Sequence, residues 1–492
     1  MIGKIILIII AAFLIITAIR AAFFKINRPD VEPMPKERVD EERVQRHLTE
    51  AIQIKTVSNV DEDKVDWAEF DKFHNFLERE FPLTHKTLKR EKVSLASLLY
   101  TWEGKNPDLD GIAFLSHQDV VPISEGTYDD WEHPPFEGYN DGEFIWGRGA
   151  LDMKNHLICV IEAVESLLED GFVPERTIYL CFGHNEEIVA GKNNGAHAIM
   201  ETLKARGVHL DSTIDEGGAI LPANVNGILK GNLAGVGIAE KGNTDIKVTV
   251  HAKGGHSSQP PQHTGVGLIS DVVHDLEKHQ FKAKMLPMVD DMFNIIGKHM
   301  TYPARLFMCN LPLLKPLVLA IAKKIPPAAS FIRTTTACTM LEGSPAANVL
   351  PQTASVTVNF RQLPGTSTED LFAHIRKVVR NKDIDIEFIK GKEASAISPT
   401  DTKAFETLTL LSHQMDKYNI VAPYLVMGGT DTYHYEDICD NLYRYAPFTV
   451  GTSLLLTTHS TNERCPVDQL TEGVQFFKRY MKIMAGNEYA EH

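Results

Sequence analysis

The sequence lacks the features of two large classes of protein. Lysine and arginine number 50 against 65 aspartates and glutamates, so the formal net charge is −15, and no basic stripe accompanies it. This balance argues against a nucleic-acid partner. The chain also has no Gly-x-Ser-x-Gly elbow, the turn that presents the nucleophile in α/β-hydrolases. The sequence therefore gives no support to a serine hydrolase of that kind.

Cysteine is scarce, and its spacing excludes the common cysteine motifs. The six cysteines are Cys159, Cys181, Cys309, Cys338, Cys439 and Cys465. No two of them have the close spacing of a zinc knuckle or a redox pair. A metal site in this chain would therefore use histidine and carboxylate ligands, which suit catalytic rather than structural zinc.

A long apolar run occurs at the N-terminus and predicts a hydrophobic helix. Residues 5–24 are apolar apart from Thr17 and Arg20. The part before Arg20 has the length of a signal-peptide core, and the whole run approaches the roughly 20 residues that span a bilayer. Residues 1–25 are therefore a membrane anchor or a signal segment, and the lack of a small-x-small cleavage site favours the anchor. We expect the rest of the chain to be anchored or secreted and extracytoplasmic, although the basic residues after the run favour the opposite orientation.

The length of 492 residues and the hydrophobic content of 43% predict a folded protein with two or more domains. Residues 26–40 are rich in proline and charge, as a linker would be. In residues 41–241, short apolar runs such as "GIAFLSH" and "RTIYLCFGH" alternate with helical patterns such as "LDMKNHLICVIEAVESLLED". This order predicts an α/β fold, with a mostly parallel sheet and helices on both faces.

The pattern changes in residues 242–392. "TDIKVTVHAKGG" and "TASVTVNFRQLP" alternate strictly between apolar and polar residues, as half-exposed strands do. We interpret this part as a smaller α+β lid domain that splits the main domain, which resumes in residues 393–492. Between the two strands lies an apolar helical stretch that is too interrupted for a membrane span. It is interpreted as packing within the insert, and the alternative is an apolar surface for an acyl chain, a partner subunit or the bilayer.

Acidic and histidine residues recur where the predicted strands end. They are His117 and Asp119, Asp152, Glu186 and Glu187, Asp215 and Glu216, and His459. Open parallel sheets bind ligands at the carboxyl ends of their strands. Nitrogen and carboxylate ligands suit zinc, so the set predicts a metal site at this edge of the sheet.

The motifs that carry these residues resemble those of one family when they are read in order. They are "SHQDVVP", "WGRGALDMK", "GHNEE", "DEGG", "GGHSSQPP", "NVLPQTASVTVNFR" and "HSTNE". The chain is similar to the di-zinc exopeptidases that include carboxypeptidase S, aminoacylase and succinyl-diaminopimelate desuccinylase. The likeness is greatest to the large members, carboxypeptidase S and the N-fatty-acyl-amino-acid synthase/hydrolase, and it covers about residues 40–485.

The resemblance implies two Zn²⁺ ions. It assigns Asp152 as the ligand that bridges them, with His117 and Asp215 on one ion and Glu187 and His459 on the other. Glu216 competes with Asp215, because family members vary between the two acids at this point. The resemblance also implies an α/β fold of the zinc-exopeptidase type.

The resemblance further assigns the catalytic and substrate-binding groups. Glu186 is the general base, and His256 of the lid stabilises the oxyanion. Asp119 supports His117 or a neighbouring group without binding the metal itself. Asn348 and Arg361 contact the substrate. His256, Asn348 and Arg361 act either within one chain or across a homodimer formed through the lid.

The implied activity is hydrolysis of an amide bond next to a free carboxylate, on N-acyl amino acids with apolar or fatty acyl groups. The alternative is a carboxypeptidase or dipeptidase acting on short peptides. A different class, a catalytically inactive membrane-tethered binding protein, is disfavoured because Glu186 and all expected ligands are present. One departure concerns Tyr433, which stands where the family often has arginine and is followed by His434. This departure leaves open how the free carboxylate or the leaving group is held, and His434 is either a substrate contact or a structural histidine.

Overall fold

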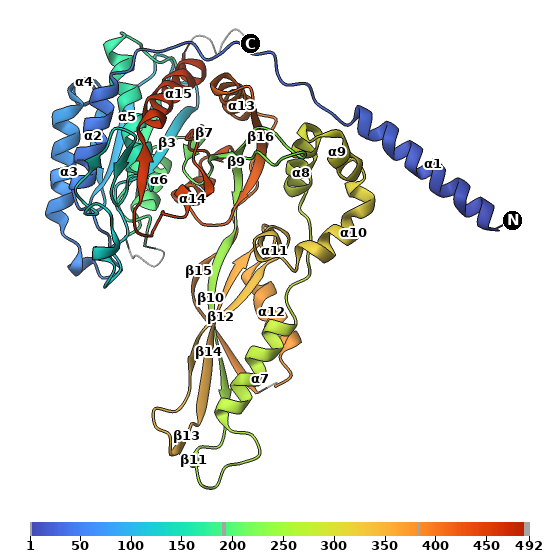
Figure 1. The fold of residues 1–492 in the computed structure, drawn as a ribbon. Coiled ribbons are helices and arrows are strands. Elements are labelled where there is room, and N and C mark those ends of the chain that lie inside the picture. The colour runs from blue at the N-terminus through green and yellow to red at the C-terminus, as the bar shows by residue number, and fades with distance from the viewer. Residues whose placement is uncertain (1, 189–192, 382, 487–492) are drawn as a thin grey trace.

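The computed structural model describes residues 2–188, 193–381 and 383–486. A large nine-stranded sheet forms the centre of the chain (Figure 1). Its strands, in order across the sheet, are β1 (Lys89–Val93), β2 (Ser97–Trp102), β6 (Ile178–Gly183), β3 (Gly111–His117), β7 (Leu210–Asp215), β17 (Leu442–Arg444), β9 (Asn232–Glu240) and β16 (Asn419–Val426), and β8 (Ile220–Pro222) pairs with β9.

Parallel pairing is concentrated at the centre of this sheet. β6, β3, β7 and β17 run parallel to one another, and β9 runs parallel to β16. β1, β2 and β8 add antiparallel pairs, and β17 meets β9 antiparallel. The predicted α/β fold is confirmed, with a mixed sheet whose parallel centre brings the carboxyl ends of β6, β3 and β7 side by side.

Helices cover both faces of the sheet, as predicted. One face carries α2 (Glu41–Gln53), α5 (Lys154–Glu169), α13 (Lys403–Met415) and α15 (Val467–Ala485), with α3 (Trp67–Glu80) and α4 (Pro82–Thr87) beside them. The other face carries α6 (Gly195–Ala205) and the 3₁₀ helix η3 (Asp431–Asp437). Nearly every residue of α5 is buried, because it lies between the sheet, α2 and α15. Its buried charged side chains are paired with neighbouring elements: Glu162 with Arg43 of α2, Glu165 with the amide of Thr84 and Lys154 with the carbonyl of Ala51.

The second sheet contains β12 (Thr335–Glu342), β14 (Thr353–Gln362), β10 (Gly242–His251) and β15 (Ile384–Lys392), in that order. Helix α7 (Gly265–Lys278) and helix α12 (Thr368–Val378) accompany it, and alternate residues such as Ile246, Val248 and Val250 are fully buried in its core. Two short strands, β11 (Gly255–His256) and β13 (Val349–Leu350), form the tip of this lid, at the end remote from the large sheet (Figure 1). We propose the division into domains that the sequence suggests, with a main domain of residues 41–241 and 393–492 and a lid of residues 242–392.

The apolar helical stretch between the lid strands does not pack only within the insert. It forms α8 (Pro287–His299), α9 (Tyr302–Met308), α10 (Leu311–Ala322) and α11 (Pro326–Ile332). Helix α8 packs on β16 of the large sheet, and Met285, Leu286 and Val289 join the main core. The interpretation as packing within the insert is therefore wrong for α8, because its apolar face packs against the large sheet.

The N-terminal helix α1 (Ile2–Phe23) extends away from the body of the molecule and contacts α9 (Figure 1). In the described part of the chain, Lys4–Phe23 is long and apolar enough to cross a membrane, and the bent pair Tyr302–Met308 and Leu311–Ala322, meeting at 87°, passes the same test together. A signal sequence has the same length and composition, so anchor and signal both stand as interpretations.

The remaining elements are short and lie near the strand ends of the large sheet. They are η1 (Glu62–Lys64), η2 (Tyr128–Asp130), α14 (Thr452–Leu455) and a small sheet of β4 (Tyr139–Asn140), β5 (Phe144–Trp146) and β18 (Arg464–Pro466). Pairing of β18 with β5 brings residues 459–463 beside the loop at 147–153.

A buried ionic network joins the lid to the large sheet. Glu240, the last residue of β9, accepts hydrogen bonds from Arg444 Nε at 2.8 Å, Lys392 Nζ at 2.9 Å and Thr430 Oγ1 at 2.7 Å. Burial alone would raise the pKa of Glu240, but the charges of Arg444 and Lys392 outweigh it and lower the pKa to about 2. Because Lys392 ends β15 of the lid, this carboxylate ties the two sheets together.

We therefore expect Glu240→Ala to destabilise the protein by about 3–5 kcal/mol, because it leaves the buried Arg444 and the half-buried Lys392 without their counter-ion. The free energy of unfolding, measured by urea denaturation and circular dichroism, checks this. Glu342→Ala removes the exposed pair with Lys247 and serves as the control. Its cost should stay below about 1 kcal/mol. Equal costs for the two variants would contradict the assigned role of Glu240.

Candidate active site

Three neighbouring strands of the large sheet deliver most of the predicted site residues to one edge. His117 is the last residue of β3, Asp215 is the last residue of β7, and Glu216 follows it. Glu186 and Glu187 follow β6. Because β6, β3 and β7 are adjacent and parallel, their carboxyl ends meet at the place where open α/β sheets bind ligands.

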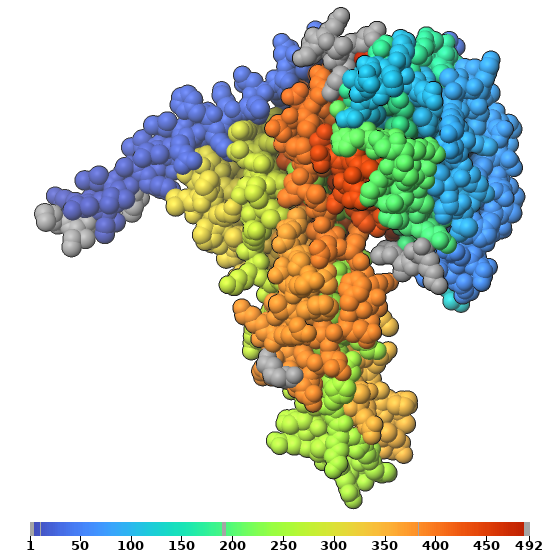
Figure 2. Space-filling view, turned by 180° about the vertical axis from the view of Figure 1, so that it is seen from behind, coloured from blue at the N-terminus to red at the C-terminus, as the bar shows by residue number. Residues whose placement is uncertain are grey.

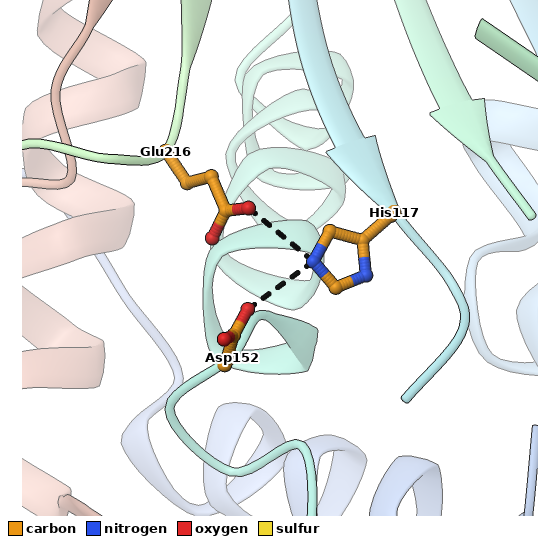
Figure 3. Close-up of side chains that lie close together, drawn as sticks. All are labelled: His117, Asp152 and Glu216. Carbon is orange, nitrogen blue, oxygen red and sulfur yellow. Dashed lines mark hydrogen bonds and ion pairs between the residues drawn. The ribbon is translucent and has the colours of Figure 1, made fainter. Parts of the chain in front are cut away.

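One cluster forms around His117. Its Nε2 lies 3.2 Å from Asp152 Oδ1 and 3.4 Å from Glu216 Oε1 (Figure 3). Asp152 comes from the loop between β5 and α5, so three separate parts of the chain converge on one imidazole. Their donor atoms lie close enough to one another to hold a single metal ion.

A second cluster forms around His459, which lies in the loop after α14. Its Nε2 is 3.0 Å from Asp152 Oδ2 and 3.0 Å from Glu187 Oε2. The two oxygens of Asp152 therefore face two different histidines, each accompanied by a further carboxylate. His459 has a φ of 60°, a conformation that costs free energy for a residue with a side chain. Such conformations cluster at functional sites.

Asp215 and Glu216 occupy different environments. The carboxylate of Asp215 accepts hydrogen bonds from Thr432 Oγ1 at 2.6 Å and from the amide of Glu216 at 2.8 Å. It does not belong to any of the described groups of side chains that could hold a metal ion, whereas Glu216 does. Of the two alternatives, the geometry places Glu216 with His117 and Asp152, while Asp215 faces the chain around Thr432.

Asp119 supports the acidic loop after β6. Its two oxygens accept hydrogen bonds from the backbone amides of Glu186, at 3.1 Å, and Glu187, at 3.3 Å. Its own carbonyl oxygen lies 2.9 Å from Nδ1 of His117. Asp119 is fully buried. It therefore positions three of the predicted site residues at once.

The loop that carries Asp152 is held by two residues that the sequence analysis missed. Glu463 Oε1 accepts hydrogen bonds from the amides of Leu151, at 2.9 Å, and Asp152, at 3.1 Å, and Arg148 donates to Glu463 Oε2 at 2.6 Å. The peptide bond between Asp152 and Met153 is cis. Arg148 and Glu463 lie inside the motifs "WGRGALDMK" and "HSTNE". Their positions close to Asp152 and His459 in the sequence could have identified them as candidate site residues.

Electrostatics in this site strongly favours cations. Burial raises the pKa of Glu186 well above its ordinary value, and the negative charges of Glu216, Asp431 and Glu187 add to the rise against the opposing effect of His117. Burial and the charge of Asp152 likewise raise the pKa of Glu216.

The same surroundings act on the two histidines. Hydrogen bonds to Asp152 and Glu187 raise the pKa of His459 to about 10. Burial opposes the charged form of His117, but Glu216, Asp119 and Asp152 outweigh it and raise its pKa. Like-charged carboxylates at this spacing need positive charge among them.

The donor set fits a two-metal centre. Each cluster offers one imidazole nitrogen and carboxylate oxygens, with Asp152 common to both. Imidazole and carboxylate are typical ligands of catalytic zinc. In two-metal sites the ions lie about 3.5–4 Å apart, a separation that one carboxylate spans.

The three predicted lid residues lie in two places. His256 and Asn348 line a pocket at the tip of the lid, where both are exposed and the His256 ring bonds to Ser258. Figure 1 shows this tip far from the strand ends of the large sheet. Within one chain, His256 and Asn348 are therefore not brought to the metal-ligand clusters.

Arg361 lies at the opposite end of the lid, where β14 pairs with the first residues of β10. Burial, together with the charges of Arg361 and Arg333, lowers the pKa of Lys241 to about 8. Arg361, Lys241 and Arg333 thus form a group of positive charges at the junction of lid and large sheet.

Tyr433 and His434 are not part of either cluster. Lys392 Nζ lies 3.3 Å from the centre of the Tyr433 ring, in a cation–π contact, and the His434 ring packs on Tyr433 at 3.8 Å. Burial lowers the pKa of His434 to about 3, so the ring is neutral. These contacts favour a structural role for both residues.

Comparison with known proteins confirms the family that the ordered motifs indicate. The description "Peptidase family M20/M25/M40" matches residues 113–483. A protein of Dictyostelium discoideum, named probable carboxypeptidase S-like 2, is 36% identical over 486 residues, covering 96% of this chain and 92% of the relative. The N-fatty-acyl-amino acid synthase/hydrolase PM20D1 of Mus musculus is 32% identical, covering 91% of this chain and 90% of the relative.

A solved structure shares the fold. The M20 family metallo-carboxypeptidase Sso-CP2 from Sulfolobus solfataricus superposes with a TM-score of 0.63 at 17% identity, covering 90% of this chain and 99% of that one. The likeness to this structure concerns the fold, and the family follows from the sequence matches. The chain therefore belongs to peptidase family M20/M25/M40 and is a hydrolytic metallopeptidase.

Proposed function

We propose that the protein is a di-zinc amidohydrolase that cleaves the amide bond of N-acyl amino acids next to the free carboxylate. The observation that carries this proposal is the position of Asp152, whose two oxygens each face a separate histidine–carboxylate group at 3.0–3.2 Å. Asp152 would bridge the ions, with His117 and Glu216 completing one site and Glu187 and His459 the other. Glu216 replaces Asp215 in this assignment because Asp215 is bonded to Thr432.

Zinc held by these residues would polarise the amide carbonyl and make water a better nucleophile. The chain itself supplies the proton transfer. Glu186 stands next to the ligand Glu187, and its amide is held by Asp119. We assign Glu186 the role of general base, which takes a proton from the attacking water and delivers it to the leaving amine nitrogen.

The substrate carboxylate would bind at Arg361, since guanidinium forms paired hydrogen bonds with carboxylates. Lys241 and Arg333 add positive charge at the same junction. His256 and Asn348 lie too far along the lid to serve their own chain's site. We therefore propose a homodimer in which the lid tip of one chain brings these residues to the site of its partner.

The choice of substrate follows the names of the relatives and the nature of the site. The mouse relative is named for N-fatty-acyl amino acids, and the Dictyostelium relative for a carboxypeptidase. Both activities cleave an amide next to a free carboxylate, and hydrolysis and condensation share one catalytic centre. Cleavage of short peptides is the alternative function. We further propose that α1 is a retained anchor, because it packs on α9 of the folded chain.

Glu186→Gln should retain the metal and lose at least about 10²-fold in kcat, because the amide cannot accept the proton. The measurement is turnover of N-oleoyl-phenylalanine and of an N-blocked dipeptide by the zinc-loaded full chain, with zinc content determined in parallel. The unaltered protein should prefer the acyl amino acid. A clear preference for the dipeptide would establish the alternative function.

Glu436→Gln is the matched control, since this exposed glutamate lies outside the metal-ligand clusters and bonds to the Ala396 amide. Its turnover should stay close to that of the unaltered protein. Undiminished turnover in Glu186→Gln would refute the general-base assignment.

Glu216→Gln and Asp215→Asn separate the two candidate ligands. Glu216→Gln should reduce bound zinc from about two ions to about one per chain after dialysis, because one cluster loses a charged ligand. Asp215→Asn should keep both ions, with affinity lowered by about 10–100-fold at most, as for a residue outside the ligand set. Metal analysis and isothermal titration with Zn²⁺ provide the readout, and the reverse order of effects would restore Asp215 as the ligand.

A further inference from the structure

A cavity of about 500 Å³ borders the metal-ligand clusters, since Asp152 and Glu216 are among its lining residues. Met292 and Ile296 of α8, with Phe331 of α11, line the part contributed by the helical insertion. The volume lies within the roughly 300–1,000 Å³ of typical small-molecule sites. Because α8 packs on the large sheet and lines this cavity, the cavity lies between the helical insertion and the sheet.

The lining of this cavity is apolar. Apart from Asp152 and Glu216, its lining residues include no acidic or basic side chain other than His156. Burial lowers the pKa of His156 to about 3, so that ring is neutral. The charged amino terminus of a short peptide would lose its hydration here without gaining a counter-ion. An uncharged alkyl chain would instead bury apolar surface, which is favourable.

Small residues line the sheet side of the cavity. Gly218, Ala234, Gly235 and Ala422 all line it, and they come from β9, β16 and the loop before β8. The rings of Tyr424 on β16 and Phe331 on α11 contact each other edge to face, with 5.8 Å between ring centres, and both line the cavity. Small residues and aromatic rings together give a predominantly apolar surface rather than a polar recognition pocket.

We propose that this cavity binds the alkyl chain of a long-chain N-acyl amino acid, with the amide beside Asp152 and Glu216. The proposal rests on the proposed amidohydrolase function and adds the binding site for the acyl group. Recognition would depend on chain length, since each buried methylene contributes about fourfold in affinity.

Ile296→Trp tests the cavity without touching the site residues, because it fills the space beneath α8. The kcat/KM for N-oleoyl-phenylalanine should fall by at least about tenfold, the equivalent of two or more methylenes. The kcat/KM for N-acetyl-phenylalanine should stay within about twofold, since its acyl group ends beside Asp152 and Glu216. Ile296→Ala, which widens the space, should shift the preferred chain length upward.

Ile389→Trp is the matched control, because Ile389 lies exposed on β15 of the lid. It should leave both substrates unaffected. If the unaltered chain cleaves neither substrate, the amidohydrolase function itself fails. If it cleaves both and Ile296→Trp lowers the two rates equally or not at all, the function stands and the acyl cavity is refuted.

A separate observation concerns the outer face of α10. Leu313, Leu317 and Ile321 recur every four residues, and each is more than half exposed. This spacing places them on one side of the helix. Large apolar side chains gathered on one exposed face mark an interaction surface.

The position of α10 indicates what covers this face. The neighbouring helix α9 binds α1, with Tyr302 Oη donating to Ala18 O at 3.1 Å and Arg20 Nη2 donating to Cys309 O at 2.7 Å. Figure 2 shows the α1 arm adjoining the helical insertion. Lys323 and Lys324 end the helix, where they suit anionic lipid headgroups.

We infer that the apolar face of α10 lies in the surface of the bilayer that α1 enters. Interfacial helices bury such a face at the boundary between headgroups and acyl chains. This inference requires that α1 is retained, and it is independent of the substrate.

Lipid contact is measurable with a fluorophore on a single introduced cysteine of the full chain. Leu317→Cys, labelled with NBD in phosphatidylcholine–phosphatidylserine vesicles, should be quenched by nitroxide-labelled lipid. Val60→Cys, exposed on the catalytic part, is the control and should be quenched only by water-soluble nitroxide. The full chain without an introduced cysteine, treated with NBD in the same way, gives the background signal from its native cysteines. Equal lipid quenching at both positions, or none at Leu317→Cys, would overturn the inference.

Discussion

The arrangement of the site depends on one carboxylate, that of Asp152. Its two oxygens lie within 3.2 Å of His117 and 3.0 Å of His459, which are separated by most of the chain. That geometry requires the loop at 147–153 to be held still, and Glu463 does this by accepting two of its backbone amides while Arg148 neutralises it. Because Glu463 follows His459 by four residues, the contact that orients Asp152 also positions His459.

The second constraint is repulsion among the acidic groups. Four half-buried carboxylates converge at the strand ends: Glu186, Glu187, Glu216 and Asp152. Contacts from the surrounding protein must therefore fix their positions against mutual repulsion. Asp119 binds the backbone of the two adjacent glutamates rather than their side chains, which leaves both carboxylates free to face the site. Such preorganisation means that little rearrangement is needed when cations bind or when charge develops during reaction. It fits the separate roles proposed for the two neighbouring glutamates.

The sequence could predict the edge of the sheet but not every side chain on it. Apolar runs in β3, β6 and β7 predict buried parallel strands. The structure has His117 at the end of β3 and Glu186 and Glu187 after β6, as the sequence predicts. Asp215 and Glu216 are adjacent, so their side chains leave the backbone in different directions, and only the contact with Thr432 decides which one faces the site. The pair of Arg148 and Glu463 joins residues more than 300 positions apart, and no local pattern encodes that contact.

The packing of the helical insertion could not be predicted from the sequence either. Its apolar period predicts helices but does not identify the surface that each covers, because a stripe of leucine and methionine fits any apolar partner. In the folded chain α8 covers β16 and the cavity, while α9 holds α1 and α10 keeps an exposed apolar face. One insertion therefore contributes both to the cavity beside the strand ends and to an exposed apolar face. If α10 lies in the bilayer surface as inferred, an alkyl chain held beneath α8 would lie in the same segment as the helix that contacts lipid.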